Sequence, residues 1–180
     1  PRAVVRSGGG RPALTVLCRT PEQLEAAIAA NIANIELDWM EMVGLAQAVA
    51  RLRDTGRAVT IATVRVQKPG EEGFDRRIEK LAPAAVLVRH WGALMHFAEL
   101  PATANRPLLH GDFSLNVTNS ITANHLLGLG LDTITAAHDL DERQLFEMLS
   151  HVDASRVAVV VHHHIATFHT EHCVYSHMLS

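Results

Sequence analysis

The sequence has few cysteines, no long apolar run and no excess of basic residues, and each absence excludes a class of protein. Two cysteines in 180 residues rule out a small domain stapled by several disulfides and favour a reducing compartment, so we expect a cytoplasmic protein. No apolar run approaches the roughly 20 residues that span a bilayer, and we expect no membrane span. The 16 basic residues are balanced by 19 acidic ones, so the totals show no electrostatic footprint for nucleic acid.

Apolar residues and histidines are abundant. Hydrophobic residues make up 48% of the chain, which suffices for the core of one domain. Twelve histidines occur, and six of them lie between His162 and His177. The chain starts at Pro1 and stops at Ser180 within this histidine-rich segment, so we interpret it as a fragment of a longer protein.

Strand-like and helix-like segments alternate along the chain. Residues 1–12 are typical of a linker or a frayed terminal segment. Strand patterns follow at 13–19, 35–39, 58–66, 85–89, 107–110, 132–137 and 157–162. Helical patterns lie between them, with Thr20, Pro21 and Gln23 marking the first helix start and Asp141 with Gln144 the last.

This alternation predicts an α/β fold in which about seven parallel strands form an incomplete TIM-barrel-like domain over residues 13–180, truncated at its C-terminal end. Spacing near 25 residues requires parallel strands with crossover helices. A complete barrel typically takes about 250 residues, more than the chain has. An open dinucleotide-binding sheet is the alternative, but the run Gly8–Gly10 precedes the first strand instead of following it.

Polar residues follow the end of every predicted strand, which is where barrels carry their functional groups. Each could be an ordinary loop residue, but their agreement over seven strands favours a site. These residues are Cys18, Arg19, Glu36, Asp38, Arg65, Gln67, Lys68, Arg89, His90, Asp112, Asn116, Asn119, His138, Asp139 and His162–His164.

From this set we predict a catalytic role for Asp112 and substrate contacts from Arg65, Lys68, Asn116, Asn119 and His162. Asp112 and Asn116 suit hydrogen bonding to a ligand, although a structural loop network is the alternative. Asn119 also suits a helix cap. His162 and His164 would face one side of a strand and His163 the other.

The segment from His169 to Cys173 combines imidazole, carboxylate and thiol groups. Such groups bind zinc or iron, although the spacing matches no standard zinc signature. We predict His169 and Cys173 as metal ligands and Glu171 and His172 as candidate catalytic bases. A histidine-rich loop without metal is the alternative.

Four segments of the chain resemble the peptidase U32 family, in particular its large bacterial members, once called collagenase-like proteases. They are VLCRTPEQL from Val16, TVRVQKPGEEGF from Thr63, GDFSLNVTN from Gly111 and FHTEHCVYSHMLS from Phe168. The resemblance spans about 13–180 and implies a barrel-like region of a longer polypeptide.

The resemblance implies two possible activities. Some relatives are oxygen-independent hydroxylation factors that act on RNA or on a quinone ring, and several hold a [4Fe–4S] cluster through four cysteines. It therefore implies Cys173 as one cluster ligand, with the others in the rest of the polypeptide; Ser176 stands where relatives often have a second cysteine. The alternative activity is a metal- or cysteine-dependent peptidase.

A third possibility is a non-catalytic barrel half that binds a partner. An incomplete barrel would expose a sheet edge, through which it could self-associate.

Overall fold

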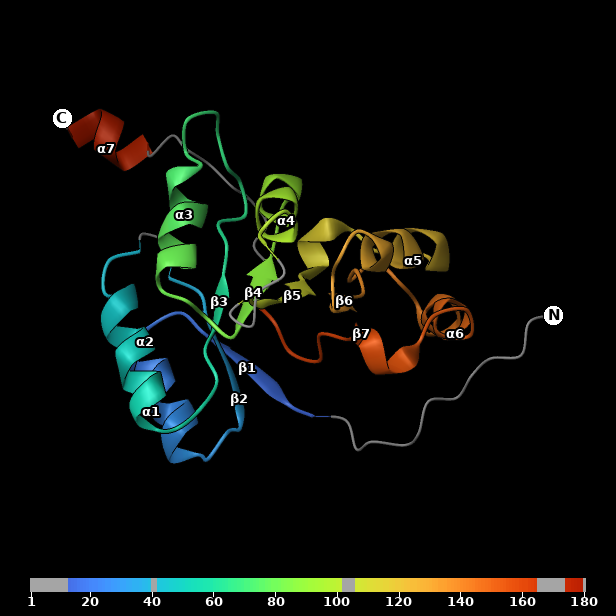
Figure 1. Cartoon of the computed structure of the whole chain (residues 1–180), viewed down its shortest axis with the longest axis horizontal. Coiled ribbons are helices and arrows are strands. Elements are labelled where there is room, and N and C mark those ends of the chain that lie inside the picture. The colour runs from blue at the N-terminus through green and yellow to red at the C-terminus, as the bar shows by residue number, and fades with distance from the viewer. Residues whose placement is uncertain (1–12, 40–41, 102–105, 165–173, 180) are drawn as a thin grey trace.

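The structure, a computed structural model, describes residues 13–39, 42–101, 106–164 and 174–179 (Figure 1). Among these residues strands alternate with helices. The strands are β1 Thr15–Cys18, β2 Asn34–Leu37, β3 Thr60–Ala62, β4 Ala85–Val88, β5 Leu108–Gly111, β6 Thr133–Thr135 and β7 Val157–Ala158. The helices are α1 Pro21–Ala29, α2 Leu45–Asp54, α3 Gly73–Lys80, α4 Trp91–Ala98, α5 Ser120–Gly128, α6 Glu142–Leu149 and α7 Val174–Leu179, with 3-10 turns η1 Phe113–Leu115 and η2 Ala154–Arg156.

The seven strands form one parallel sheet in chain order, from β1 to β7. Within the described residues β1 pairs with β2 alone and β7 with β6 alone, so the sheet curls into a half-barrel without closing. The prediction of an incomplete TIM-barrel-like fold with about seven parallel strands is thus confirmed. Because all strands run the same way, their carboxyl ends meet at one edge of the sheet, which we call the carboxyl rim.

Helix starts follow the signals in the sequence. Thr20 accepts a hydrogen bond from Gln23 N at 3.3 Å, and Pro21 is the first residue of α1. The Gln23 side chain accepts from Arg19 N at 2.7 Å, one residue before the position that a capping box requires. The box at α6 is complete, since Asp141 and Gln144 exchange side-chain to backbone bonds of 2.8 and 3.0 Å.

Alternation along the strands gives the sheet an apolar outer face and an inner face that mixes polar residues with apolar ones such as Leu17 and Leu87. The outer side chains join those of the helices in one buried core, formed by Ile35, Leu37, Ile61, Val86, Val88, Leu109 and Ile134 with Leu24, Leu52, Ile78, Leu94, Phe97 and Leu126. On the inner face the register places Glu36 beside Thr60 and His110 beside Thr133. Closed barrels usually fill this space with branched aliphatic residues, so the polar residues on the inner face, Glu36 and His110 among them, mark it as a candidate for function.

Most strands are shorter than the sequence predicts, and two of them lose four residues or more. The strand predicted over 58–66 is β3, which ends at Ala62, and the one predicted over 157–162 ends at Ala158. At β7 the reason is loss of a pairing partner: after β6 the chain turns so that Ala136 bridges Val117 and Ala137 N donates to Val117 O. β-branched composition marks a preference for extended backbone, but a strand also needs a neighbour.

Figure 1 shows α1 and α2 beside the first strands, α4 to α6 along the later ones, and α7 apart from the half-barrel. None of the helices in the described part of the chain has the length and apolarity that a bilayer crossing requires.

Candidate functional site

A buried arginine, Arg89, organises the carboxyl rim. It follows β4 directly, and its guanidinium binds the Asp38 carboxylate through Nη1–Oδ1 and Nη2–Oδ2 contacts of 2.6 and 2.9 Å. Its Nε lies 3.4 Å from Asp112 Oδ2. The side chains of Arg89, Asp38 and Asp112 are 4%, 6% and 7% exposed. Arg19 adds a bond of 2.9 Å from Nε to Asp38 Oδ2. We call these four residues the Arg89 network.

The charges in this network stabilise one another. Burial alone would lower the pKa of Arg89, but the bonds to Asp38 and the charges of Asp38, Asp112 and Glu36 raise it above its ordinary value. Burial alone would raise the pKa of Asp38, yet the two guanidinium groups hold it below its usual range. Both residues therefore stay ionised at neutral pH, as a paired buried charge requires.

Hydrogen bonds hold the backbone of Arg89 as well as its side chain. Its N–H donates to Thr63 Oγ1 at 3.0 Å, and its carbonyl accepts from Ser114 Oγ at 2.9 Å. Ser114 Oγ also lies 3.1 Å from Asp112 Oδ2. The network is thus a rigid support under the rim, and Asp112 is its member nearest to η1.

Glu36 is a half-buried carboxyl on the inner face of β2. Burial is the main cause that raises its pKa, to about 7, and the negative charges of Asp112 and Asp38 add to it while Arg89 opposes it. A carboxyl with that pKa exchanges a proton near neutral pH, which is the property of a general acid or base.

An aromatic ring and three nitrogen-bearing side chains form a second group at the rim, the Phe113 cluster. Its members are Phe113 of η1, Arg65 after β3, His138 after β6 and His163 after β7. The Arg65 guanidinium lies 4.9 Å from the Phe113 ring centroid. The rings of His138 and His163 lie 4.2 and 5.2 Å from it and stack on each other at 5.5 Å.

Three polar atoms of the Phe113 cluster have no hydrogen-bond partner in the part of the chain that the structure describes. Arg65 Nη2, His138 Nε2 and His163 Nδ1 are buried, and no described residue offers them a hydrogen bond. Burial, and then the charges of Arg19, Arg65 and His138, lower the pKa of His163, so its ring is neutral at pH 7. Because buried polar atoms normally have partners, these atoms suit a ligand with a flat ring and hydrogen-bonding edges.

The structure places the predicted site residues in different surroundings. Asp112 and Arg65 lie in the two groups described above. Lys68 is exposed in the loop before α3, where its N–H donates to Glu71. Asn116 is exposed and ends η1 in a left-handed conformation with φ 55°. Asn119 is the N-cap of α5 and accepts from Thr122 N at 2.9 Å, so its side chain has the structural role that the sequence also suggested.

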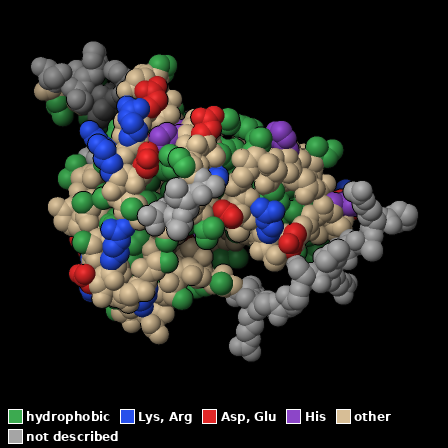
Figure 2. Space-filling view, viewed as in Figure 1, with side chains coloured by type: hydrophobic (Ala, Val, Ile, Leu, Met, Phe, Trp, Pro, Cys, Tyr) green, Lys and Arg blue, Asp and Glu red, His purple; other side chains and the backbone are tan. Residues whose placement is uncertain are grey.

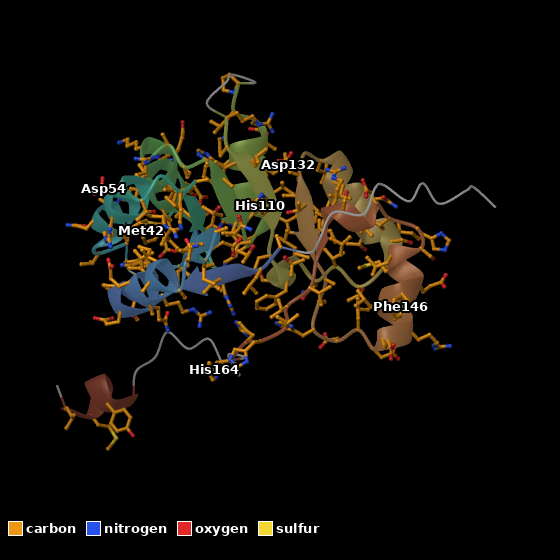
Figure 3. The ribbon with its side chains drawn as sticks, turned by 90° about the horizontal axis from the view of Figure 1, so that it is seen from below. Met42, Asp54, His110, Asp132, Phe146 and His164 are labelled. Carbon is orange, nitrogen blue, oxygen red and sulfur yellow. The ribbon has the colours of Figure 1, made fainter. Side chains whose placement is uncertain are left out.

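His162 differs from its neighbour His163. The expectation that it sits in a strand is wrong, since β7 ends at Ala158. His162 is exposed and its ring contacts that of His164 at 5.6 Å, while His163 packs into the Phe113 cluster. In Figure 3 His164 lies at the edge of the molecule, whereas His110 of β5 lies among the strands. The predicted catalytic residues Glu171 and His172 and the predicted ligands His169 and Cys173 lie outside the described residues.

The described part of the chain does not assemble a metal site. It contains no group of three or more His, Cys, Asp or Glu side chains that could hold an ion. Cys18 is 0% exposed in the apolar core, and burial raises the pKa of its thiol, which makes it a poor ligand. The described residues thus do not fit an iron–sulfur cluster by themselves.

Phe113 is the site residue that sequence reasoning missed, because only the polar residues of its segment were weighed. Its position in the turn directly after β5, where barrels build their sites, was the available signal.

Comparison with known proteins supports the fold. No protein-family model matches the chain, and no curated protein matches its sequence. Nine chains of solved structures match, among them a structure described as "The Structure of the U32 Peptidase Mk0906". That match has a TM-score of 0.62 and 16% sequence identity, and it covers 85% of this chain and 68% of the other. The chain therefore shares the fold of a U32 peptidase.

Proposed function

We propose that this chain is a barrel domain of the U32 family, of its large bacterial type, and that its carboxyl rim binds the planar ring of an RNA base or a quinone-like molecule. The Phe113 cluster carries the proposal, because it combines a ring face with three buried nitrogen atoms that no described residue satisfies. The shared fold with a U32 peptidase and the family-like motifs support the family assignment.

The residues of the rim have distinct roles in this proposal. Phe113 stacks on the substrate ring, and Arg65 donates a hydrogen bond to a ring carbonyl oxygen. His138 and His163 form hydrogen bonds with polar atoms at the edge of the substrate ring. The Arg89 network holds Asp112 in place, and Glu36 accepts or supplies a proton at its carboxyl oxygen.

The proposed reaction is hydroxylation of the bound ring, in which a ring C–H becomes C–OH. An organic hydroxyl donor bound with the ring would supply the oxygen atom, take up the ring hydrogen in its place and be reduced as the ring is oxidised. The proposed hydroxylation rests on the resemblance to oxygen-independent hydroxylation factors, for which a [4Fe–4S] cluster supplies the redox chemistry. Cys173 and His169 would bind that cluster, or a divalent metal, together with ligands from the rest of the polypeptide.

A peptidase is the second candidate, because the structural neighbour is described as one and because Glu36 has a near-neutral pKa. Glu36 would then act as the base beside the predicted residues Glu171 and His172. In this case Glu36→Gln and Glu171→Gln would each remove peptide cleavage by the full-length protein; if both variants cleave as well as the wild type, the peptidase assignment is wrong.

Ring binding tests the main proposal directly. We expect ligand-observed NMR to detect binding of uridine and of hydroquinone to the wild-type chain. Phe113→Ala should weaken it at least about fivefold, as loss of one stacking contact predicts. Phe146→Ala is the matched control, because Phe146 of α6, labelled in Figure 3, is 64% exposed. Equal binding by the two variants, or no binding of either ring by the wild type, would refute the proposal.

The cofactor needs a separate measurement. Full-length protein purified without oxygen should be brown and contain iron, and Cys173→Ser should lower its iron content. A colourless, iron-free preparation would contradict the hydroxylase; if it also self-associates and cleaves no peptide, a non-catalytic binding role follows.

A further inference from the structure

Three arginines surround a depression at the opposite end of the half-barrel from the carboxyl rim. Arg53 lies in the last turn of α2, Arg57 precedes β3 and Arg106 precedes β5. Together with the backbone segments before β3 and β4 they line a space of about 420 Å³. Asp54, which follows Arg53, is labelled in Figure 3. Buried Val59 and Pro83 give the depression an apolar floor.

Two of these arginines are held in place by backbone carbonyls. Arg53 Nη2 donates to Leu81 O at 2.5 Å and to Ala82 O at 2.9 Å. Arg57 Nε donates to Ile32 O at 2.8 Å, and its Nη2 donates to Asn31 Oδ1 at 3.1 Å. These bonds use part of each guanidinium and leave further N–H groups available, so the arginines are positioned before any ligand arrives.

Arg106 has no such anchor. No hydrogen bond or ion pair joins its guanidinium to the described residues. Its Nη2 lies beside Gly130, where an added Cβ would be 3.6 Å away. The charge of Arg106 is therefore available to a ligand in the depression.

The charge of the depression contrasts with the rest of the molecule. Among the described residues, every charged side chain that lines it is an arginine and none is a carboxylate. Three arginines elsewhere pair with carboxylates: Arg51 binds Glu25 with bonds of 2.6 and 2.7 Å, and Arg89 and Arg19 bind Asp38. On the face shown in Figure 2 the basic and acidic side chains are interspersed. In a chain of net charge −3, three arginines without a carboxylate among them form a local anion-attracting site.

We propose that this depression binds a phosphate group, either a free phosphate or phosphomonoester or a phosphodiester of an RNA strand. Planar guanidinium groups bind phosphate oxygens in pairs, and several arginines around one space are the usual arrangement for this. A space of about 420 Å³ also has room for the sugar or chain attached to the phosphate. The site is remote from the carboxyl rim, so it is independent of the proposed ring binding.

Calorimetric titration of the full chain with inorganic phosphate at constant ionic strength tests the proposal. We expect saturable binding that Arg106→Ala weakens about tenfold, as loss of one charge-assisted hydrogen bond predicts. Arg106→Ala removes no hydrogen bond among the described residues, and an unchanged circular dichroism spectrum would show that it folds. Arg143→Ala, which removes an exposed arginine from α6, is the matched control and should bind as the wild type does.

A second titration with a single-stranded oligouridylate distinguishes the sources. The ligand is an RNA phosphodiester if oligouridylate binds, if phosphate displaces it and if Arg106→Ala weakens its binding. The ligand is a free phosphate or phosphomonoester if phosphate binds and oligouridylate does not. Absence of saturable phosphate binding, or equal loss in the Arg106 and Arg143 variants, would overturn the proposal.

Discussion

Replacing Glu36 by glutamine tests how the inner face of the half-barrel accommodates a carboxylate. The carboxyl has a pKa of about 7 in the folded protein, against an ordinary value of 4.5. Between these two pH values the folded state holds a proton that the unfolded state has lost. The free energy of unfolding contributed by Glu36 therefore falls as pH rises through this window and stays low above it.

The size of the effect follows from the difference between the pKa of Glu36 in the folded protein and its ordinary value. About 2.5 pH units at 1.36 kcal/mol each give an upper bound of about 3 kcal/mol. Because the side chain is half-buried, solvent that reaches the carboxylate reduces this, and we expect about 1–3 kcal/mol. Glutamine cannot ionise, so Glu36→Gln should be more stable than the wild type by this amount at pH 8 and within about 0.5 kcal/mol of it at pH 4.5.

Urea unfolding followed by circular dichroism at the two pH values measures the difference. Glu99→Gln, at the exposed C-cap of α4, is the matched control and should change stability by less than about 0.5 kcal/mol at either pH. A variant that is no more stable than the wild type at pH 8, or whose advantage is the same at both pH values, would refute the assignment of a near-neutral pKa to Glu36.

Three further substitutions test the rim: two change its structural supports, and one changes the Phe113 cluster. Arg89→Met should lower the free energy of unfolding by about 3–5 kcal/mol in urea titrations, because it leaves Asp112 buried without a counter-charge and Asp38 with only the partly exposed Arg19; a loss below about 1 kcal/mol would contradict this. Gly111→Ala should lower the free energy of unfolding by about 1–3 kcal/mol, because the added Cβ would lie 2.8 Å from Leu131 Cδ1. Gly128→Ala is the control and should not destabilise the protein in the same assay, because no atom lies within 4 Å of its added Cβ. His163→Ala should weaken uridine binding measured by NMR and His162→Ala should not; the reverse order would show that the Phe113 cluster is not the binding site.

The sequence predicts where the carboxyl rim lies and which residues reach it, but it does not predict which of their side chains contact one another. Asp38 and Arg89 each follow a strand, so the pattern of the sequence brings both to the rim. Their pairing joins residues 51 apart in the chain, and no local signal specifies it. The geometry arises only when β2, β3 and β4 curl, because curvature turns neighbouring inner side chains toward one another.

The histidine-rich segment shows where strand patterns mislead. Alternation predicts His162 and His163 on opposite sides of a strand, and the predicted substrate contact is from His162. The chain loses its pairing partner after Ala158, and His163 enters the Phe113 cluster instead. Side-chain direction follows from the backbone path, which depends on which neighbour supplies hydrogen bonds.

By itself the sequence determined the alternation of strands and helices, the parallel sheet and the edge at which polar groups collect. These features follow from periodicity and chain connectivity, which are local properties of the sequence. Tertiary structure alone decided that Arg89 is the buried charge shared by Asp38 and Asp112, that Phe113 gathers Arg65, His138 and His163, and that Arg53, Arg57 and Arg106 meet at the opposite end. Each of these depends on distances between residues far apart in the chain, which packing sets and sequence spacing does not.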